Sequence, residues 1–143
     1  MKAYLTRRVW FSASHRLHND NKSEEENQLI YGKCNNPHGH GHNYFVEVTV
    51  AGQVNPCTGM VCNLQYLDAF IEKAILGPFA LSNLNYIESL QVTIPTTENL
   101  CLELYQIFKK GFSHANIEKI RVEETMLNSF EYWGDGDGKS GGR

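Results

Sequence analysis

Hydrophobic positions with the spacing of β-strands characterise the first third of the chain. Residues 3–15 form an extended apolar run, and residues 42–54 are rich in β-branched and aromatic side chains, so both segments are predicted to be strands. Residues 16–33 between them are polar and include the acidic run 24–26, which predicts a solvated excursion with a helical turn. Turn-forming residues at 55–59 end the second strand.

The hydrophobic period changes to that of a helix at Asn63. From this predicted N-cap, apolar residues recur at helical spacing to position 78, which predicts an amphipathic helix whose hydrophobic face packs on a sheet. A second helix of the same kind is predicted over residues 96–111 and ends with two lysines and a glycine. Residues 117–125 and 128–133 then have the pattern of a strand hairpin.

The order strand, strand, helix, helix, strand, strand predicts the α+β fold class. We expect an antiparallel four-stranded sheet (ββααββ) with both helices on one face. Such a sheet has two exposed edges, which favour pairing with another subunit. Residues 1–133 are predicted to form a single domain, and the glycine-rich residues 134–143 a flexible tail.

Composition restricts the class of protein and its partners. At 143 residues, with 41% hydrophobic and 20% charged residues, the chain has the composition of one soluble globular domain. A formal charge of -3 and a pI near 6.0 provide no global field for nucleic acid or an acidic membrane surface. Residues 1–8 lack the apolar centre of a signal peptide, and no apolar run has the length of a transmembrane helix. We therefore expect a cytoplasmic protein without a nucleic-acid or membrane partner.

The stretch from Cys34 to Tyr44 is the most chemically dense part of the sequence, because one thiol and three imidazoles fall within nine of its residues. Alternate side chains of a strand point to the same face, so His40 and His42 are predicted to project together. His15, at the end of the first strand, is a natural third ligand if the two strands are neighbours. Three imidazoles and one open position are the arrangement of a catalytic zinc site.

The histidines also have an explanation without a metal. His-Gly repeats occur in solvated loops and in expression tags, and a His-x-His pair alone does not prove a metal site. A tag, however, has no reason to lead into the apolar strand that follows Tyr44. The metal site is therefore the favoured interpretation.

The four cysteines form no Cys-x-x-Cys pair and are expected to be free thiols in a reducing compartment. Cys57, Cys62 and Cys101 have apolar neighbours and are predicted to be buried or passive. Cys34 lies between Lys33 and the predicted zinc. These surroundings lower the pKa of a thiol and favour its use as a base or nucleophile.

Five short motifs follow one another along the chain: Phe11-Ser12-Ala13-Ser14-His15, the Cys34–Tyr44 stretch, Gly59-Met60-Val61-Cys62-Asn63-Leu64, Thr96-Thr97-Glu98-Asn99 and Glu123-Glu124-Thr125. In residues and order they resemble the 6-pyruvoyl-tetrahydropterin synthase and 6-carboxy-tetrahydropterin synthase family over about residues 8–133. The resemblance implies the tunnelling fold (T-fold), in which strand edges of three subunits close a barrel. Two such barrels stack into a homo-hexamer.

The resemblance also implies roles for single residues. His15, His40 and His42 match the family's zinc ligands, so Zn²⁺ is the implied cofactor. Cys34 matches the catalytic proton acceptor. Glu124 matches the glutamate that anchors the pterin and takes part in the charge relay, and a carboxylate suits two N–H donors on the pyrimidinone edge.

Residues near these positions have roles that the sequence leaves open. Thr97 and Glu98 belong to the motif at the start of the second helix and are assigned to substrate binding. For Glu98, a favourable interaction with the positive end of its helix is an equally good explanation. Arg16 and Lys33 flank the site and are candidates for contact with phosphate, although surface solvation also explains both.

The implied reaction converts 7,8-dihydroneopterin triphosphate into 6-pyruvoyl-tetrahydropterin with elimination of triphosphate, as a zinc-assisted carbon–oxygen lyase. One departure matters: where the family carries Asp-His, this chain has Ala80-Leu81, and neither residue can carry a proton. Three explanations stay open. The chain is a synthase with weakened proton transfer, an inactive homologue that still binds zinc and pterin, or an enzyme with another product, such as a 6-carboxy-tetrahydropterin or a side-chain cleavage product.

Overall fold

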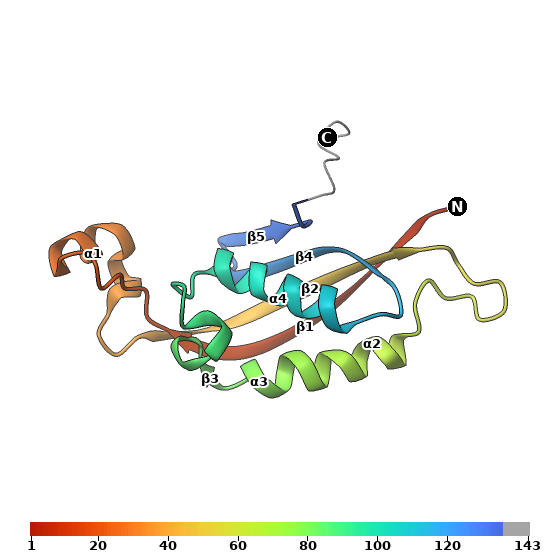
Figure 1. The fold of residues 1–143 in the computed structure, drawn as a ribbon, viewed down its shortest axis with the longest axis horizontal. Coiled ribbons are helices and arrows are strands. Elements are labelled where there is room, and N and C mark those ends of the chain that lie inside the picture. The colour runs from red at the N-terminus through yellow and green to blue at the C-terminus, as the bar shows by residue number, and fades with distance from the viewer. Residues whose placement is uncertain (136–143) are drawn as a thin grey trace.

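The computed structural model of the protein describes residues 1–135 and has one five-stranded sheet at its centre (Figure 1). The strands stand in the order β3-β1-β2-β4-β5, and they are β1 (Ala3–His15), β2 (His40–Gly52), β3 (Ser82–Asn83), β4 (Asn116–Thr125) and β5 (Asn128–Tyr132). The α+β class is therefore confirmed. The predicted count of four strands is wrong, because the two-residue β3 adds an edge strand that runs parallel to β1. A strand of two residues is too short to leave a hydrophobic period in the sequence.

Strands β1 and β2 pair in antiparallel register along their whole length (Figure 1). The register places His15 opposite His40 and Ala13 opposite His42. Because side chains alternate between the two faces of a strand, these residues and Tyr44 share one face. The prediction that the two strands are neighbours is confirmed, and their shared end carries the histidines.

Helices cover one face of this sheet. The first, α2 (Leu64–Ile71), is capped by Asn63, whose side chain accepts a hydrogen bond from the Gln65 main-chain N–H. It continues through a single π-helical turn, η2 (Glu72–Leu76), into the short helix α3 (Gly77–Phe79). The predicted single helix is thus three segments on one axis (Figure 1).

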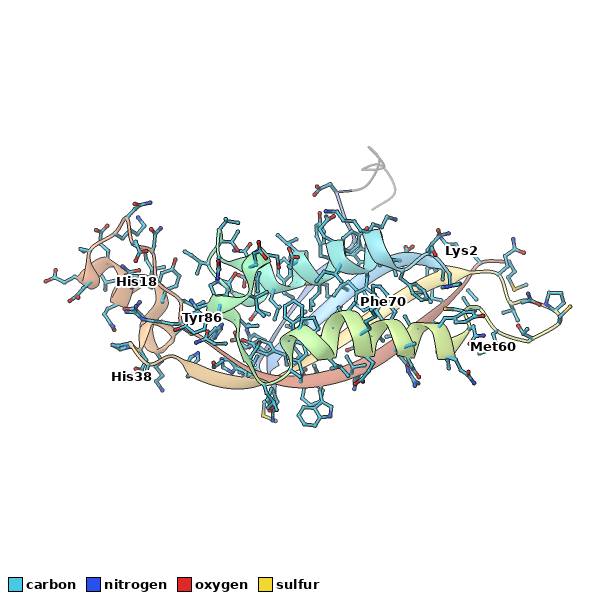
Figure 2. All side chains as sticks on the ribbon, turned by 60° about the horizontal axis from the view of Figure 1, so that its bottom comes forward. Lys2, His18, His38, Met60, Phe70 and Tyr86 are labelled. Carbon is cyan, nitrogen blue, oxygen red and sulfur yellow. The ribbon has the colours of Figure 1, made fainter. Side chains whose placement is uncertain are left out.

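Helix α4 (Thr97–Gly111) lies beside α2 on the same face of the sheet (Figure 2). Phe70 lies between the two helices and contacts the rings of Phe108 and Phe112, with centroids 5.3 and 5.6 Å away. Gly111 makes this approach possible, because a Cβ at its position would lie 2.7 Å from the Phe70 ring. Both predicted helices therefore cover the sheet as expected.

The core lies between these helices and the sheet. Its completely buried members come from the apolar faces that the sequence period predicted, and they include Leu67, Ile75, Leu100, Leu104 and Phe108 from the helices and Val50, Ile120 and Val122 from the sheet. Burial of each such side chain stabilises the fold by about 1.5–3 kcal/mol. This packing supports β1 and β2, which carry the histidines at their shared end.

The polar excursion folds as helix α1 (Glu24–Tyr31) followed by a 3₁₀ turn, η1 (Gly32–Asn35), which carries Cys34. A capping box fixes the start of α1, because the Ser23 side chain accepts from the Glu26 N–H while the Glu26 carboxylate accepts from the Ser23 N–H. The acidic run therefore stabilises a helix N-terminus, and the helix is longer than the single turn predicted.

Two 3₁₀ turns, η3 (Leu84–Tyr86) and η4 (Glu88–Leu90), connect β3 to α4. No helix within residues 1–135 is long and apolar enough to cross a membrane. The predicted flexible tail lies mostly outside the described residues, which end at Asp135.

Candidate active site

Three imidazoles converge where β1 ends and β2 begins. The Nε2 atom of His40 lies 3.1 Å from Nε2 of His15 and 3.1 Å from Nε2 of His42. Two zinc–nitrogen bonds of about 2.0–2.1 Å at a tetrahedral angle would separate their nitrogens by about 3.3 Å. His40 therefore lies at the spacing of a shared metal ion from both His15 and His42. The three side chains are called the histidine cluster below.

His15 is held in the tautomer that a metal requires. Its Nδ1 atom lies 2.8 Å from the main-chain oxygen of Pro95, which can only accept, so Nδ1 carries the proton. The lone pair of Nε2 then points into the cluster, and this carbonyl contact is a typical support for a metal-ligating histidine. The ring is 0% exposed, and its burial lowers the pKa of His15 below its ordinary value, which favours the neutral imidazole that binds metal.

Cys34 and Glu124 each lie beside two members of the histidine cluster. The potential ligand atoms of His15, Cys34 and His40 are all within 4.8 Å of one another, and so are those of His15, His42 and Glu124. Glu124 Oε2 lies 3.7 Å from His15 Nε2 and 3.9 Å from His42 Nε2. The structure thus brings five predicted site residues from β1, β2, β4 and η1 together. This donor set suits a divalent metal ion and leaves a thiol and a carboxylate beside it.

Thr97 and Glu98 occupy different surroundings, although they are neighbours in the sequence. The buried Thr97 hydroxyl donates a 2.7 Å hydrogen bond to Glu124 Oε2, so the first turn of α4 orients the carboxylate. Glu98 is exposed in the same turn, and within residues 1–135 its carboxylate has no recorded hydrogen bond or ion pair. Its position favours the interaction with the helix N-terminus over contact with the site.

The prediction of a lowered Cys34 pKa assumed both Lys33 and a zinc ion beside the thiol, and the protein groups alone shift this pKa in the opposite direction. Burial and the nearby Glu124 carboxylate raise the pKa of the Cys34 thiol, because both disfavour the thiolate. Lys33, expected to lower that pKa, is exposed to solvent. Among the other cysteines, Cys62 and Cys101 are buried as predicted, whereas Cys57 is exposed.

Ala80 and Leu81 lie at the sheet edge next to β3. The Leu81 N–H donates to the Ser12 main-chain oxygen at 2.6 Å, and its side chain is 89% exposed. A recess of about 440 Å³ beside it is lined by Leu81, by Ser12 and Ser14 of β1, and also by His42 of the histidine cluster. Leu81 and the predicted metal ligand His42 therefore border the same recess. Within the described chain, no recorded hydrogen bond or ion pair joins Ala80 or Leu81 to Cys34.

Residues that support the site were not found from the sequence. Pro95 contributes only a main-chain carbonyl, for which no residue type is required, and its place before the α4 N-cap was the sole signal. Asn35 follows Cys34 in the dense motif and is 3% exposed. The only signal in the sequence was its position directly after the proposed base, because its burial is known from the structure alone.

The fold and the cluster define a class: an α+β domain with a histidine-based metal centre beside a thiol and a carboxylate, as in metal-dependent enzymes. Residues 4–135 match the family described as 6-pyruvoyl tetrahydropterin synthase, and the chain belongs to this family. The predicted resemblance is therefore confirmed.

Curated relatives agree with this assignment. The chain is 45% identical to the 6-pyruvoyl tetrahydrobiopterin synthase of Poecilia reticulata over 92% of this chain and 90% of the relative. It is 42% identical to the Homo sapiens protein of the same name, over 94% and 93% of the two chains. The solved Caenorhabditis elegans 6-pyruvoyl tetrahydropterin synthase superposes with a TM-score of 0.88 at 35% identity, covering 94% of this chain and 96% of that one.

Proposed function

We propose that this chain is a metal-dependent carbon–oxygen lyase that converts 7,8-dihydroneopterin triphosphate into 6-pyruvoyl-tetrahydropterin and triphosphate. The observation that carries the proposal is that three imidazoles, Cys34 and Glu124 form two groups of potential metal ligands that share His15. The names of the relatives, which match over most of the chain, support the same activity.

In this proposal His15, His40 and His42 hold Zn²⁺. Neutral imidazoles at this spacing and the carbonyl contact of His15 support the choice of ligands. When bound, zinc supplies a Lewis acid for the side-chain oxygens of the substrate and so acidifies the adjacent C–H bonds.

Cys34 is the proposed proton acceptor, and Glu124 the proposed pterin anchor. The Cys34 thiol lies at the edge of the histidine cluster, within reach of a side chain bound there. Glu124 accepts two N–H bonds from the 2-amino-pyrimidinone edge of the pterin, while Thr97 holds one carboxylate oxygen in place. Glu98 is the weakest member of the proposed set, because its side chain is exposed.

The triphosphate needs cations close to the cluster. Lys33 shares with His40 a recess of about 420 Å³ that is also lined by Gln28, Gly32 and Asn36. None of these lining residues is acidic, so a phosphate group meets no like charge there. We include Lys33 as the proposed phosphate contact.

The test is identification of the products by mass after zinc-loaded protein is incubated with 7,8-dihydroneopterin triphosphate. We expect 6-pyruvoyl-tetrahydropterin and triphosphate in equal amounts, and loss of both after zinc is removed with a chelator. No product after long incubation of fully zinc-loaded protein would contradict the lyase activity.

A second candidate function is favoured by Ala80-Leu81, which carries no proton-transfer group. In this alternative the chain binds zinc and pterin without turnover. The same incubation distinguishes this alternative from the lyase, because a binding homologue retains the pterin without releasing triphosphate. A 6-carboxy-tetrahydropterin or a side-chain cleavage product would be recognised by its mass.

The proposed assembly is a hexamer made of two stacked trimers, in the cytoplasm. Short strands at both edges of the sheet and exposed aromatic residues on its open face, Tyr4, Trp10 and Phe45, support assembly through the sheet. Four free thiols suit a reducing compartment. Light scattering should give six times the 16.3 kDa of one chain, and a monomer at micromolar concentration would contradict this assembly.

A further inference from the structure

Cys34 is carried by a segment that has little stability of its own. It lies in η1, a 3₁₀ turn of four residues between α1 and β2, at the end of the molecule where α1 and the labelled His18 lie (Figures 1 and 2). Short 3₁₀ turns have poor hydrogen-bond geometry and are marginal without outside support. Something other than the local backbone must therefore fix the thiol beside the histidine cluster.

The side chain of Asn35 is the centre of that support. Its Nδ2 atom donates to the Leu17 main-chain oxygen at 2.7 Å and to His18 Nδ1 at 2.9 Å. Its Oδ1 atom accepts from Gln28 Nε2 at 3.0 Å. The amide thus links the segment after β1, helix α1 and the turn that carries the thiol. All three bonds form at a residue only 3% exposed, where an unpaired polar group would be costly.

Main-chain bonds extend the same connection to the metal ligands. The Leu17 N–H donates to the Cys34 carbonyl at 2.8 Å, and Arg16 Nε donates to the Asn35 carbonyl at 3.3 Å. Leu17 and Arg16 follow directly after His15. The thiol and the ligand at the end of β1 are therefore held by one hydrogen-bonded unit.

We propose that Asn35 is a positioning residue that sets the Cys34 thiol against the histidine cluster. This inference rests on the proposed function, because it takes Cys34 as the proton acceptor. Asparagine suits the position because its amide offers two donors and an acceptor, and the three contacts use both kinds. Aspartate has the same shape but no donor, so its carboxylate would face the Leu17 carbonyl and the turn would shift.

The decisive variant is Asn35→Asp in the full zinc-loaded chain. We expect kcat to fall on the order of 10²-fold, the loss typical of a catalytic group displaced by about 1 Å. Zinc content should stay within about twofold of the parent and KM should change less than kcat, because Asn35 forms no hydrogen bond with Glu124 or the histidine cluster within the described residues. A variant with parental kcat would overturn the proposal.

A second measurement does not depend on the proposed function. Cys57 is exposed in a turn away from the site and serves as an internal reference, whereas Cys62 and Cys101 are buried. Alkylation with iodoacetamide, followed by peptide mass spectrometry, gives the labelling rate of Cys34 relative to Cys57. Asn35→Asp should raise this ratio several-fold, since the released turn exposes the thiol. An unchanged ratio overturns the proposal even if the parent protein shows no lyase activity.

Asn27→Asp is the matched control. Asn27 is also buried, but its amide bonds the Asn19, Lys22 and Ser23 carbonyls at the start of α1. It should lower the melting temperature like Asn35→Asp and leave both the labelling ratio and kcat unchanged. If both variants change the ratio equally, general loosening explains the result and the proposal fails.

Gln28→Leu provides the same test if Asn35→Asp does not fold. It removes only the donor to Asn35 Oδ1, from a residue on the exposed side of α1. The labelling ratio of Cys34 to Cys57 should then rise about threefold, the equivalent of one weak hydrogen bond. A folded Gln28→Leu protein with the parental ratio would count as a failure.

Discussion

The histidine cluster and the turn at residues 80–81 both adjoin β1, yet their chemistry is opposite. In the cluster, His15 is buried and its tautomer is fixed by the Pro95 carbonyl, whereas His40 and His42 are partly buried. A thiol and a carboxylate lie beside these imidazoles. The turn is exposed, apolar at Ala80 and Leu81, and Leu81 adopts a positive φ of 59°. The chain therefore has the residues proposed for metal binding and proton acceptance, whereas it lacks the proton-transfer pair that the family resemblance predicts at the turn.

The largest effect is expected from breaking the cluster itself. His40→Ala removes the central imidazole, whose Nε2 lies 3.1 Å from both neighbours, so we expect loss of bound zinc. Turnover should fall by more than about 10³-fold, since a metal contributes several kcal/mol to the barrier. Zinc is measured by mass spectrometry of the dialysed protein.

His38→Ala is the matched control for this variant, because His38 is exposed and lies two positions away. It should keep parental zinc and rate. Full zinc content in His40→Ala would mean that the ligand set is misassigned.

The second-largest effect is expected from a variant that distinguishes metal binding from proton acceptance. Cys34→Ala should keep zinc and lower kcat by about 10²–10⁴-fold, the usual cost of a lost general base. The parallel variant Cys57→Ala removes an exposed thiol and should change neither quantity. Loss of zinc in Cys34→Ala would instead make this thiol a ligand, a role that its place within 4.8 Å of two imidazoles allows.

A third experiment introduces the family's proton-transfer pair at residues 80 and 81. Ala80→Asp combined with Leu81→His should raise kcat by roughly 10- to 10²-fold, because a general acid–base pair is supplied. His114 does not provide this function in the parent, since its ring stacks on Tyr66 with centroids 4.3 Å apart. Initial rates with equal zinc loading give the measurement.

Leu81→Asn is the control for the restored pair, because asparagine tolerates a positive φ but does not transfer protons near pH 7. A double variant no faster than Leu81→Asn would show that the turn has no part in turnover by this chain.

The same contrast explains what the sequence could and could not predict. His40 and His42 were found because the period of a strand dictates their common direction, and His15 because two successive long strands pair as neighbours. Glu124 came only from the family resemblance, since no local pattern indicates that β4 pairs next to β2. Main-chain partners such as the Pro95 carbonyl have no side-chain signature.

Cys34 lies beside the histidine cluster, as the sequence led us to expect, but the electrostatic surroundings of its thiol differ from those expected. Sequence neighbours suggested a lysine beside the thiol, whereas the fold directs Lys33 to solvent and brings in Glu124 from a distant strand. The partial burial of Cys34 was not predicted either. For this site, sequence neighbours were a poorer guide to the charges around a side chain than strand periodicity was to the direction of a side chain.

The smallest expected effect concerns the backbone of the turn. Leu81 adopts φ 59°, which costs a residue with a Cβ about 1–2 kcal/mol and glycine almost nothing. Part of this gain is offset by the greater entropy of glycine in the unfolded chain. Leu81→Gly should therefore stabilise the fold by about 0.5–1 kcal/mol in urea unfolding, without changing zinc content. Leu102→Gly, on the exposed face of α4, is the opposite control and should destabilise by about 1 kcal/mol. A destabilised Leu81→Gly would mean that the Leu81 side chain is held by contacts, for example with a neighbouring subunit, that outweigh its backbone strain.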